Sequence, residues 1–134
     1  MIVADTSFLI DLIDGDAEAI KRAGELKDEP VYISSVSIHE YLFGVYYKFY
    51  KNESLLRKKL EMAENAFNAF KVLPLSKGMA KLSAMIQVSL IKSGKEISVN
   101  DVYIGATARY YNAKLLTRNK KHFEHMEDLR IERY

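Results

Sequence analysis

The stretch Met1-Ile-Val-Ala-Asp-Thr-Ser-Phe-Leu-Ile-Asp-Leu-Ile-Asp14 decides the fold. Residues 2–4 are a short apolar run that ends at Asp5, and apolar residues then recur at helical spacing from Phe8 to Ile13. This order predicts a strand, a turn and a helix. Because α/β proteins place their sites at the carboxyl ends of strands, Asp5 is the first candidate site residue.

Strand-like and helical segments continue to alternate along the rest of the chain. Such alternation predicts an α/β fold, a three-layer α/β/α sandwich around a central, mainly parallel sheet of four or five strands. No repeat or Gly/Ser-rich linker divides the chain, so we expect residues 1–134 to form a single domain. The expected strands are residues 2–4, 31–33, 72–75, 114–117 and 129–131, and the expected helices are residues 8–13, 17–27, 35–50, 53–70, 77–92 and 100–111.

Composition narrows the class of protein. The chain has 134 residues, 49% of them hydrophobic and 28% charged, which is the balance of one globular domain. Without cysteine it can form neither a disulfide nor a thiolate zinc site. Its formal net charge of +2 is too small to identify a binder of nucleic acid. No stretch has the pattern of a signal peptide or a membrane span, and we expect a soluble, cytoplasmic protein.

Three acidic residues stand where a site could form: Asp5 after the first strand, Glu40 near the start of a helix, and Asp101 at the start of another. Each also has a local explanation. Asp5 can cap the helix that follows it, and both Ser37-Ile-His-Glu40 and Ser98-Val-Asn-Asp101 fit a capping box. Together, three carboxylates in one crevice would suit a hard cation such as magnesium, which takes oxygen ligands. We therefore expect the three to converge.

Four segments resemble the PIN-domain nucleases in their order and spacing. They are Ile2–Ser7, Ser35–Gly44, Asn100–Ala108 and Leu116–Asn119. The resemblance extends over essentially the whole chain. Because the chain is also small, it is most similar to the VapC toxins of prokaryotic toxin-antitoxin pairs. It implies one PIN domain with a PIN-like α/β/α sandwich, an RNA substrate, a VapB-type antitoxin as partner and a homodimer.

The same resemblance implies roles for individual residues. Ser7 and Thr117 correspond to polar residues that support the site. Asn119 stands where many members have a fourth acid. As a neutral oxygen donor it brings no charge to offset a second dication, so we expect one firm metal site. The catalytic residues that would bind Mg²⁺ or Mn²⁺ as the cofactor are Asp5, Glu40 and Asp101.

The expected activity is hydrolysis of RNA phosphodiester bonds by an endoribonuclease. A divalent ion can activate a water, place it in line with the phosphorus and neutralise charge on the leaving oxygen, which leaves a 5′-phosphate and a 3′-hydroxyl. Three basic residues follow the strand expected at 114–117, and they are candidates either for contacts with RNA phosphates or for a solvated loop. They are Arg118, Lys120 and Lys121.

Other features leave alternatives open. The aromatic residues from Tyr41 to Tyr50 surround their helix, which fits core packing and an interface with a second copy or an antitoxin peptide equally well. His39, His122 and His125 lack the spacing of a zinc site and are expected to be structural or surface residues. Two alternative functions remain: a PIN nuclease of RNA processing or decay without an antitoxin, and a non-catalytic nucleic-acid or protein-binding module on the same fold.

Overall fold

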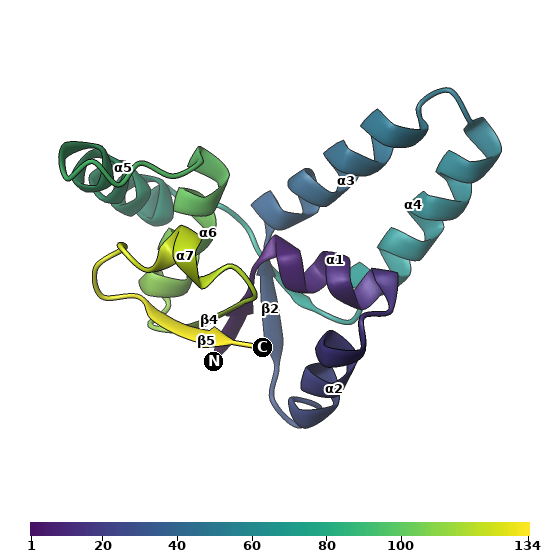
Figure 1. Cartoon of the computed structure of the whole chain (residues 1–134), viewed down its shortest axis with the longest axis horizontal. Coiled ribbons are helices and arrows are strands. Elements are labelled where there is room, and N and C mark those ends of the chain that lie inside the picture. The colour runs from purple at the N-terminus through teal and green to yellow at the C-terminus, as the bar shows by residue number, and fades with distance from the viewer.

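A computed structural model describes the whole chain, residues 1–134, as a parallel five-stranded sheet with helices on both faces (Figure 1). The strand order is β3-β2-β1-β4-β5, and every neighbouring pair is parallel. This confirms the expected α/β sandwich and places all the carboxyl ends of the strands at one edge. The strands are β1 (Ile2–Ala4), β2 (Val31–Ser34), β3 (Lys71–Leu73), β4 (Lys114–Thr117) and β5 (Arg130–Arg133).

Side-chain caps explain where most of the helices begin. Six helices have a cap residue whose side chain accepts a hydrogen bond from a backbone N–H two or three residues further on. These caps are Asp5, Asp16, Ser34, Asn52, Ser76 and Ser98. The helices are α1 (Thr6–Asp14), α2 (Ala17–Glu25), α3 (Ser35–Phe49), α4 (Glu53–Phe67), α5 (Lys77–Lys92), α6 (Val99–Tyr110) and α7 (Lys120–Phe123).

Some strand and helix ends differ from the expected ones. β3 lies earlier than the expected 72–75, because Pro74 has no N–H with which to extend the pairing to β2. β5 begins later than expected and continues beyond residue 131. It pairs with β4 along the whole length of both strands. α2 and α4 end before residues 27 and 70, because the chain turns there before the next strand.

Two local features also differ from the expectations. The prediction of a capping box at Ser37 is wrong. Ser34 caps α3, and the fully buried Ser37 hydroxyl has no hydrogen-bond partner. The helix α7 follows β4, where the polar residues 118–121 predict a loop. Phe123 and Met126 anchor this segment in the hydrophobic core, which its polar beginning does not indicate.

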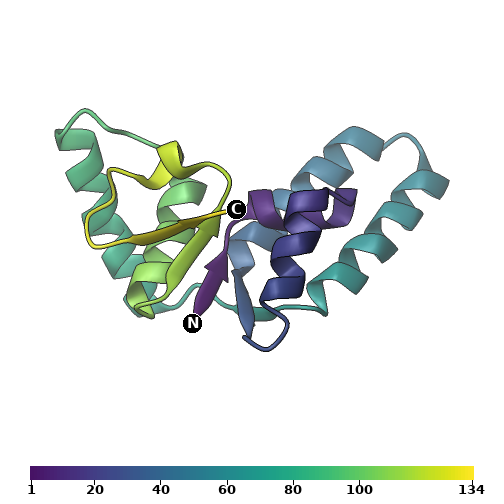
Figure 2. The same ribbon diagram turned by 60° about the horizontal axis from the view of Figure 1, so that its bottom comes forward.

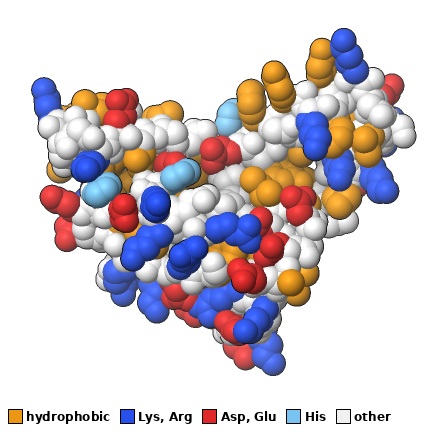
Figure 3. Space-filling view, in the orientation of Figure 1, with side chains coloured by type: hydrophobic (Ala, Val, Ile, Leu, Met, Phe, Trp, Pro, Cys, Tyr) orange, Lys and Arg blue, Asp and Glu red, His pale blue; other side chains and the backbone are white.

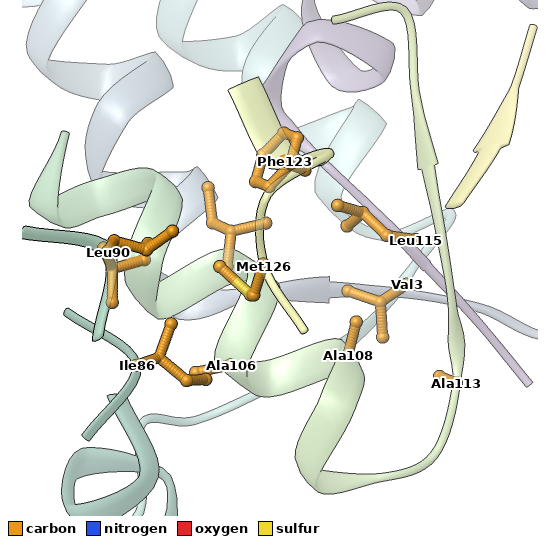
Figure 4. Close-up of a cluster of buried hydrophobic side chains, with 11 residues drawn as sticks. Val3, Ile86, Leu90, Ala106, Ala108, Ala113, Leu115, Phe123 and Met126 are labelled. Atoms are coloured by element: carbon orange, nitrogen blue, oxygen red, sulfur yellow. The ribbon is translucent and has the colours of Figure 1, made fainter. Parts of the chain in front are cut away.

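Alternating residues of the central strands divide the hydrophobic core into two parts. Val3 and Leu115 face one side of the sheet, where they pack with α5, α6 and Phe123 (Figure 4). Ile2 and Leu116 face the other side, where they pack with α1, α2 and α4. Because successive side chains of a strand point to opposite faces, both faces of these two strands are covered.

The helices form two arms that give the molecule a V-shaped outline (Figure 1). The hairpin of α3 and α4 extends away from the sheet on one side, and α5 and α6 lie on the other, as the turned view also shows (Figure 2). The start of α3 and the start of α1 lie near the notch between the arms. No helix is both long enough and apolar enough to span a membrane.

Candidate active site

An open pocket lies at the carboxyl ends of β1 and β4, close to the starts of α1 and α6. Its volume is about 690 Å³, and only two of the residues that line it are hydrophobic. This is the edge of the sheet at which parallel α/β folds place their sites. The three acids that are expected to converge all line it: Asp5, Glu40 and Asp101.

Asp5 joins β1 to α1 and combines both of the roles that its position allows. As the cap of α1 it accepts a hydrogen bond from the Phe8 N–H at 3.1 Å. Ser7 Oγ donates to the same carboxyl oxygen at 2.6 Å, and Thr117 Oγ1 donates to the other at 2.5 Å. These donors are all neutral and the residue is only 4% exposed. Burial therefore raises the pKa of the Asp5 carboxyl, although the hydrogen bonds act to lower it.

Glu40 lies in the second turn of α3 and is held from two sides. Thr6 Oγ1 donates to Glu40 Oε1 at 2.5 Å, and Asn100 Nδ2 donates to Oε2 at 3.3 Å. One carboxylate thus connects the first turns of α1 and α6 to α3. The two hydrogen bonds also fix the orientation of the Glu40 side chain at the pocket.

Asp101 lies in the first turn of α6, where its N–H donates to the capping Ser98 Oγ at 3.2 Å. Its Oδ2 lies 3.2 Å from Nδ1 of His122. Burial raises the pKa of the Asp101 carboxyl, while Ser98 and His122 lower it. The negative charges of Glu40 and Asp5 raise it further. The carboxyl of Asp101 is therefore close enough to the other two acids for their charges to act on it.

The oxygen donors of the pocket fit a hard divalent ion such as Mg²⁺ or Mn²⁺. Such ions bind carboxylate oxygens, and Mg²⁺ commonly takes only one or two from the protein and keeps several waters. A cation beside Asp5 and Asp101 would offset both the burial of Asp5 and the repulsion that raises the Asp101 pKa. No three acidic or histidine side chains lie close enough to surround an ion by themselves, so water would complete the coordination.

Ser7, Thr117 and Asn119, which are expected to support the site, form one hydrogen-bonded group. The fully buried Thr117 donates to Asp5 and accepts a hydrogen bond from the Asn119 N–H at 2.9 Å. Ser7 Oγ donates to Asp5 and accepts from the Arg118 N–H at 3.4 Å. The end of β4 and the start of α1 are thereby joined through one carboxylate, and the side chain of Asn119 lines the pocket.

The three basic residues that are expected to contact RNA have different surroundings. Lys121 lines the pocket. Arg118 forms ion pairs with Asp11 at 3.0 Å and Asp16 at 3.1 Å, which balance its charge. Lys120 is exposed and, like Arg118, does not line the pocket. The structure thus brings Lys121 to the acids and leaves the other two outside.

Sequence reasoning missed three residues that contact the acids. Thr6 and Asn100 each stand beside a predicted acid, but their hydrogen bonds go to Glu40, which is distant in sequence. His122 is expected to be a structural or surface residue, and it is exposed, but it also lines the pocket because α7 turns its neighbour Phe123 into the core. A single apolar residue in a polar segment is the one sequence signal for that turn.

The parallel sheet and the acidic pocket at its carboxyl edge define the PIN class of α/β proteins. The PIN domain family matches residues 2–129, so the chain belongs to this family, as the four sequence segments imply. The ribonuclease VapC of Rickettsia bellii is 31% identical over 130 residues, which cover 97% of this chain and 93% of that protein. Toxin FitB of Neisseria gonorrhoeae is 31% identical over 96 residues, which cover 71% and 69%. The crystal structure of FitAcB from Neisseria gonorrhoeae has a TM-score of 0.84 and 26% identity over 98% of this chain and 96% of that one.

Proposed function

We propose that this protein is a metal-dependent endoribonuclease that hydrolyses RNA phosphodiester bonds, and that it acts in the cytoplasm as the toxin of a type II toxin-antitoxin pair. The observation that carries the proposal is the presence of Asp5, Glu40 and Asp101 in one pocket at the carboxyl edge of the sheet. The names of two relatives, one a ribonuclease and one a toxin, support the substrate class and the biological role. The partner would be a VapB-type antitoxin.

The arrangement of the pocket suits hydrolysis of a phosphodiester. Bound by carboxylates of this pocket and by water, Mg²⁺ or Mn²⁺ would supply a water of lowered pKa and neutralise charge on the phosphate. Glu40 keeps its orientation when a substrate enters, because Thr6 and Asn100 hold both of its oxygens. Lys121 offers an ammonium group to a phosphate of the RNA backbone.

Cleavage of a labelled RNA with Mg²⁺, Mn²⁺ or EDTA tests the proposal. We expect cleavage only with metal, and products with a 5′-phosphate and a 3′-hydroxyl. Asp101→Asn should lower kcat/KM by about 100-fold or more, since it removes a charged ligand. Asp28→Asn, the same chemical change at an exposed position, should leave kcat/KM unchanged. Cyclic phosphate ends, or full activity in Asp101→Asn, would contradict the nuclease proposal.

Folding of the Asp101→Asn variant is the necessary control, and the structure predicts its outcome. The substitution keeps the backbone hydrogen bond to Ser98 and removes a partly buried charge that Glu40 and Asp5 repel. Thermal melts in EDTA should therefore show a variant at least as stable as the wild type. Mn²⁺ should raise the melting temperature of the wild type, because it binds the folded state, but not that of the variant.

The toxin role needs a separate test. We expect a neighbouring gene to encode a VapB-type antitoxin whose product, on co-expression, binds this chain and inhibits RNA cleavage. A PIN nuclease of RNA processing or decay would cut RNA without such an inhibitor. A non-catalytic binding module would cut no RNA with any metal, even when a broad set of RNAs is offered.

Three side chains of α3 and the residue that follows this helix form an exposed surface, here called the aromatic face, on the arm of α3 and α4. Hydrophobic side chains project from the upper edge of this arm in the space-filling view (Figure 3). Tyr41, in contrast, packs edge-on against Phe67 in the core. The homodimer that the family resemblance implies would use the aromatic face. Its residues are Phe43, Tyr46, Tyr47 and Tyr50.

A further inference from the structure

His122 is the only histidine that lines the acidic pocket. His39 stacks on an aromatic neighbour along α3, and His125 pairs with Glu124, both outside the pocket. The residue after His122 is Phe123, which is 1% exposed. Because Phe123 anchors α7 in the core, the imidazole of His122 leaves the helix on another side and reaches the acids.

The contact between His122 and Asp101 has the separation of two ligands of one ion. Nδ1 of His122 lies 3.2 Å from Oδ2 of Asp101. Two atoms that bind the same octahedral ion at right angles, each about 2.1 Å from it, lie about 3.0 Å apart. The His122 side chain is 57% exposed and has no second polar partner, so no other contact fixes the orientation of its ring.

We propose that His122 supplies a nitrogen ligand beside Asp101, so that the pocket prefers ions with affinity for imidazole, such as Co²⁺, to Mg²⁺. The inference rests on the proposed function in taking Asp101 as a metal ligand. Mg²⁺ binds oxygen ligands and gives up water reluctantly, so an imidazole adds little to its affinity. The affinity of nitrogen-containing sites rises from Mn²⁺ to Co²⁺. An imidazole that coordinates the ion therefore raises the affinity for Co²⁺ relative to that for Mg²⁺. An imidazole that only balances charge leaves this ratio unchanged.

No other residue of the pocket can supply that nitrogen. Asn119 offers an amide oxygen, and Lys121 is a cation that repels a metal ion. The remaining polar residues of the pocket carry carboxylate or hydroxyl oxygens. A substitution of His122 consequently removes the only nitrogen ligand that the pocket can offer and leaves its oxygen ligands in place.

Calorimetric titrations with Mg²⁺ and with Co²⁺, at about pH 8 where histidine is ordinarily neutral, test the inference. His122→Gln keeps a polar side chain of similar length but removes the imidazole. We expect it to lose about tenfold or more in Co²⁺ affinity and less than about threefold in Mg²⁺ affinity. The visible absorption of bound Co²⁺ should also change, because an oxygen replaces a nitrogen ligand. His125→Gln should match the wild type in every measurement.

Equal loss of both affinities in His122→Gln, or no loss of either, would overturn the nitrogen ligand. Thermal melts without metal check that the variant folds, and His122→Asn gives the same comparison if it does not. If the wild type cuts RNA with Mg²⁺ but the ratio of affinities does not change in the variants, the nuclease proposal stands and only this inference fails. If neither ion binds the wild type, the inference and the proposed metal dependence fail together.

Discussion

Glu40 depends on hydrogen bonds from residues far away in the sequence. Thr6 donates at 2.5 Å and Asn100 at 3.3 Å. Thr6→Val keeps the size of the side chain but removes the hydroxyl, so Glu40 loses its shorter hydrogen bond. We expect kcat/KM for RNA cleavage to fall about tenfold, as for other groups that orient metal-binding carboxylates. Kinetics of Thr6→Ser, which keeps the hydroxyl, should show most of the activity restored, and equal activity in Thr6→Val and wild type would exclude the positioning role.

The sequence predicts the main acids of the site, but not the side chains that contact them from distant segments. Asp5 ends a strand and caps a helix, and Asp101 lies in a capped first turn, so short patterns point to both. Their presence in one pocket with Glu40 is observed, and their binding of metal stays a prediction. His122 reaches Asp101 only because α7 forms and Phe123 is buried, which depends on packing with distant segments.

The end of β4 is joined to β1 and to α7 through Thr117. Its buried hydroxyl donates to Asp5 at 2.5 Å and accepts from the Asn119 N–H at 2.9 Å. Thr117→Val keeps the branched shape that packs in the strand but leaves both groups without this partner. We expect the free energy of unfolding, measured with urea, to fall by about 1–3 kcal/mol. Thr117→Ser keeps the hydroxyl and should retain both hydrogen bonds, and a Thr117→Val protein as stable as wild type would refute their importance.

The start of α2 predicts a dependence of stability on pH. Asp16 accepts from the Ala19 N–H at 2.9 Å and pairs with Arg118 at 3.1 Å, and both contacts hold the pKa of its carboxyl below the usual range. A carboxyl with a lower pKa in the folded state stabilises the fold above its unfolded pKa, near 3.9. That contribution is lost as the pH falls through the folded value. Asp16→Asn keeps a good cap but not the charge.

We therefore expect the wild type to exceed Asp16→Asn in free energy of unfolding at neutral pH, and the difference to shrink on acidification. Urea titrations of both proteins at neutral pH and at about pH 3 measure the two differences. Asp28→Asn, at an exposed position, serves as the control for removal of a charge. A difference between wild type and Asp16→Asn that stays constant with pH would show that the ionised carboxylate contributes nothing.

The strands that position the site could be predicted closely, but their order in the sheet could not. β1 and β4 lie at the expected residues and β2 is one residue longer, because apolar runs between turn signals define them. The pairing of β1 with β4 places Ile2 opposite Lys114, and no local sequence pattern predicts a partner so distant in the sequence. α7 has only four residues, which is too few for helical periodicity to be visible.

The architecture of the whole molecule explains why acids from distant segments meet. Side chains of β1 and β4 pack into a helix-covered core on both faces of the sheet, so neither face is open to a substrate. The carboxyl edge is where β1 and β2 end and where α1 and α3 begin. Asp5 lies at this edge, and Glu40 and Asp101 reach it from the second turn of α3 and the first turn of α6. The fold thus sets the place of the pocket, and the side chains set its chemistry.

The aromatic face predicts the assembly of the molecule. Phe43 and Tyr47 are 63% and 76% exposed, and their rings stack with centroids 6.0 Å apart. If a second copy covers them, Phe43→Ser combined with Tyr47→Ser should shift sedimentation from dimer to monomer and leave the stability of each monomer nearly unchanged. Tyr41→Ser should instead lower the free energy of unfolding by about 2 kcal/mol or more, because Tyr41 packs against Phe67. A wild type that sediments as a monomer would rule out the homodimer, and a double variant that stays dimeric would place its interface on another surface.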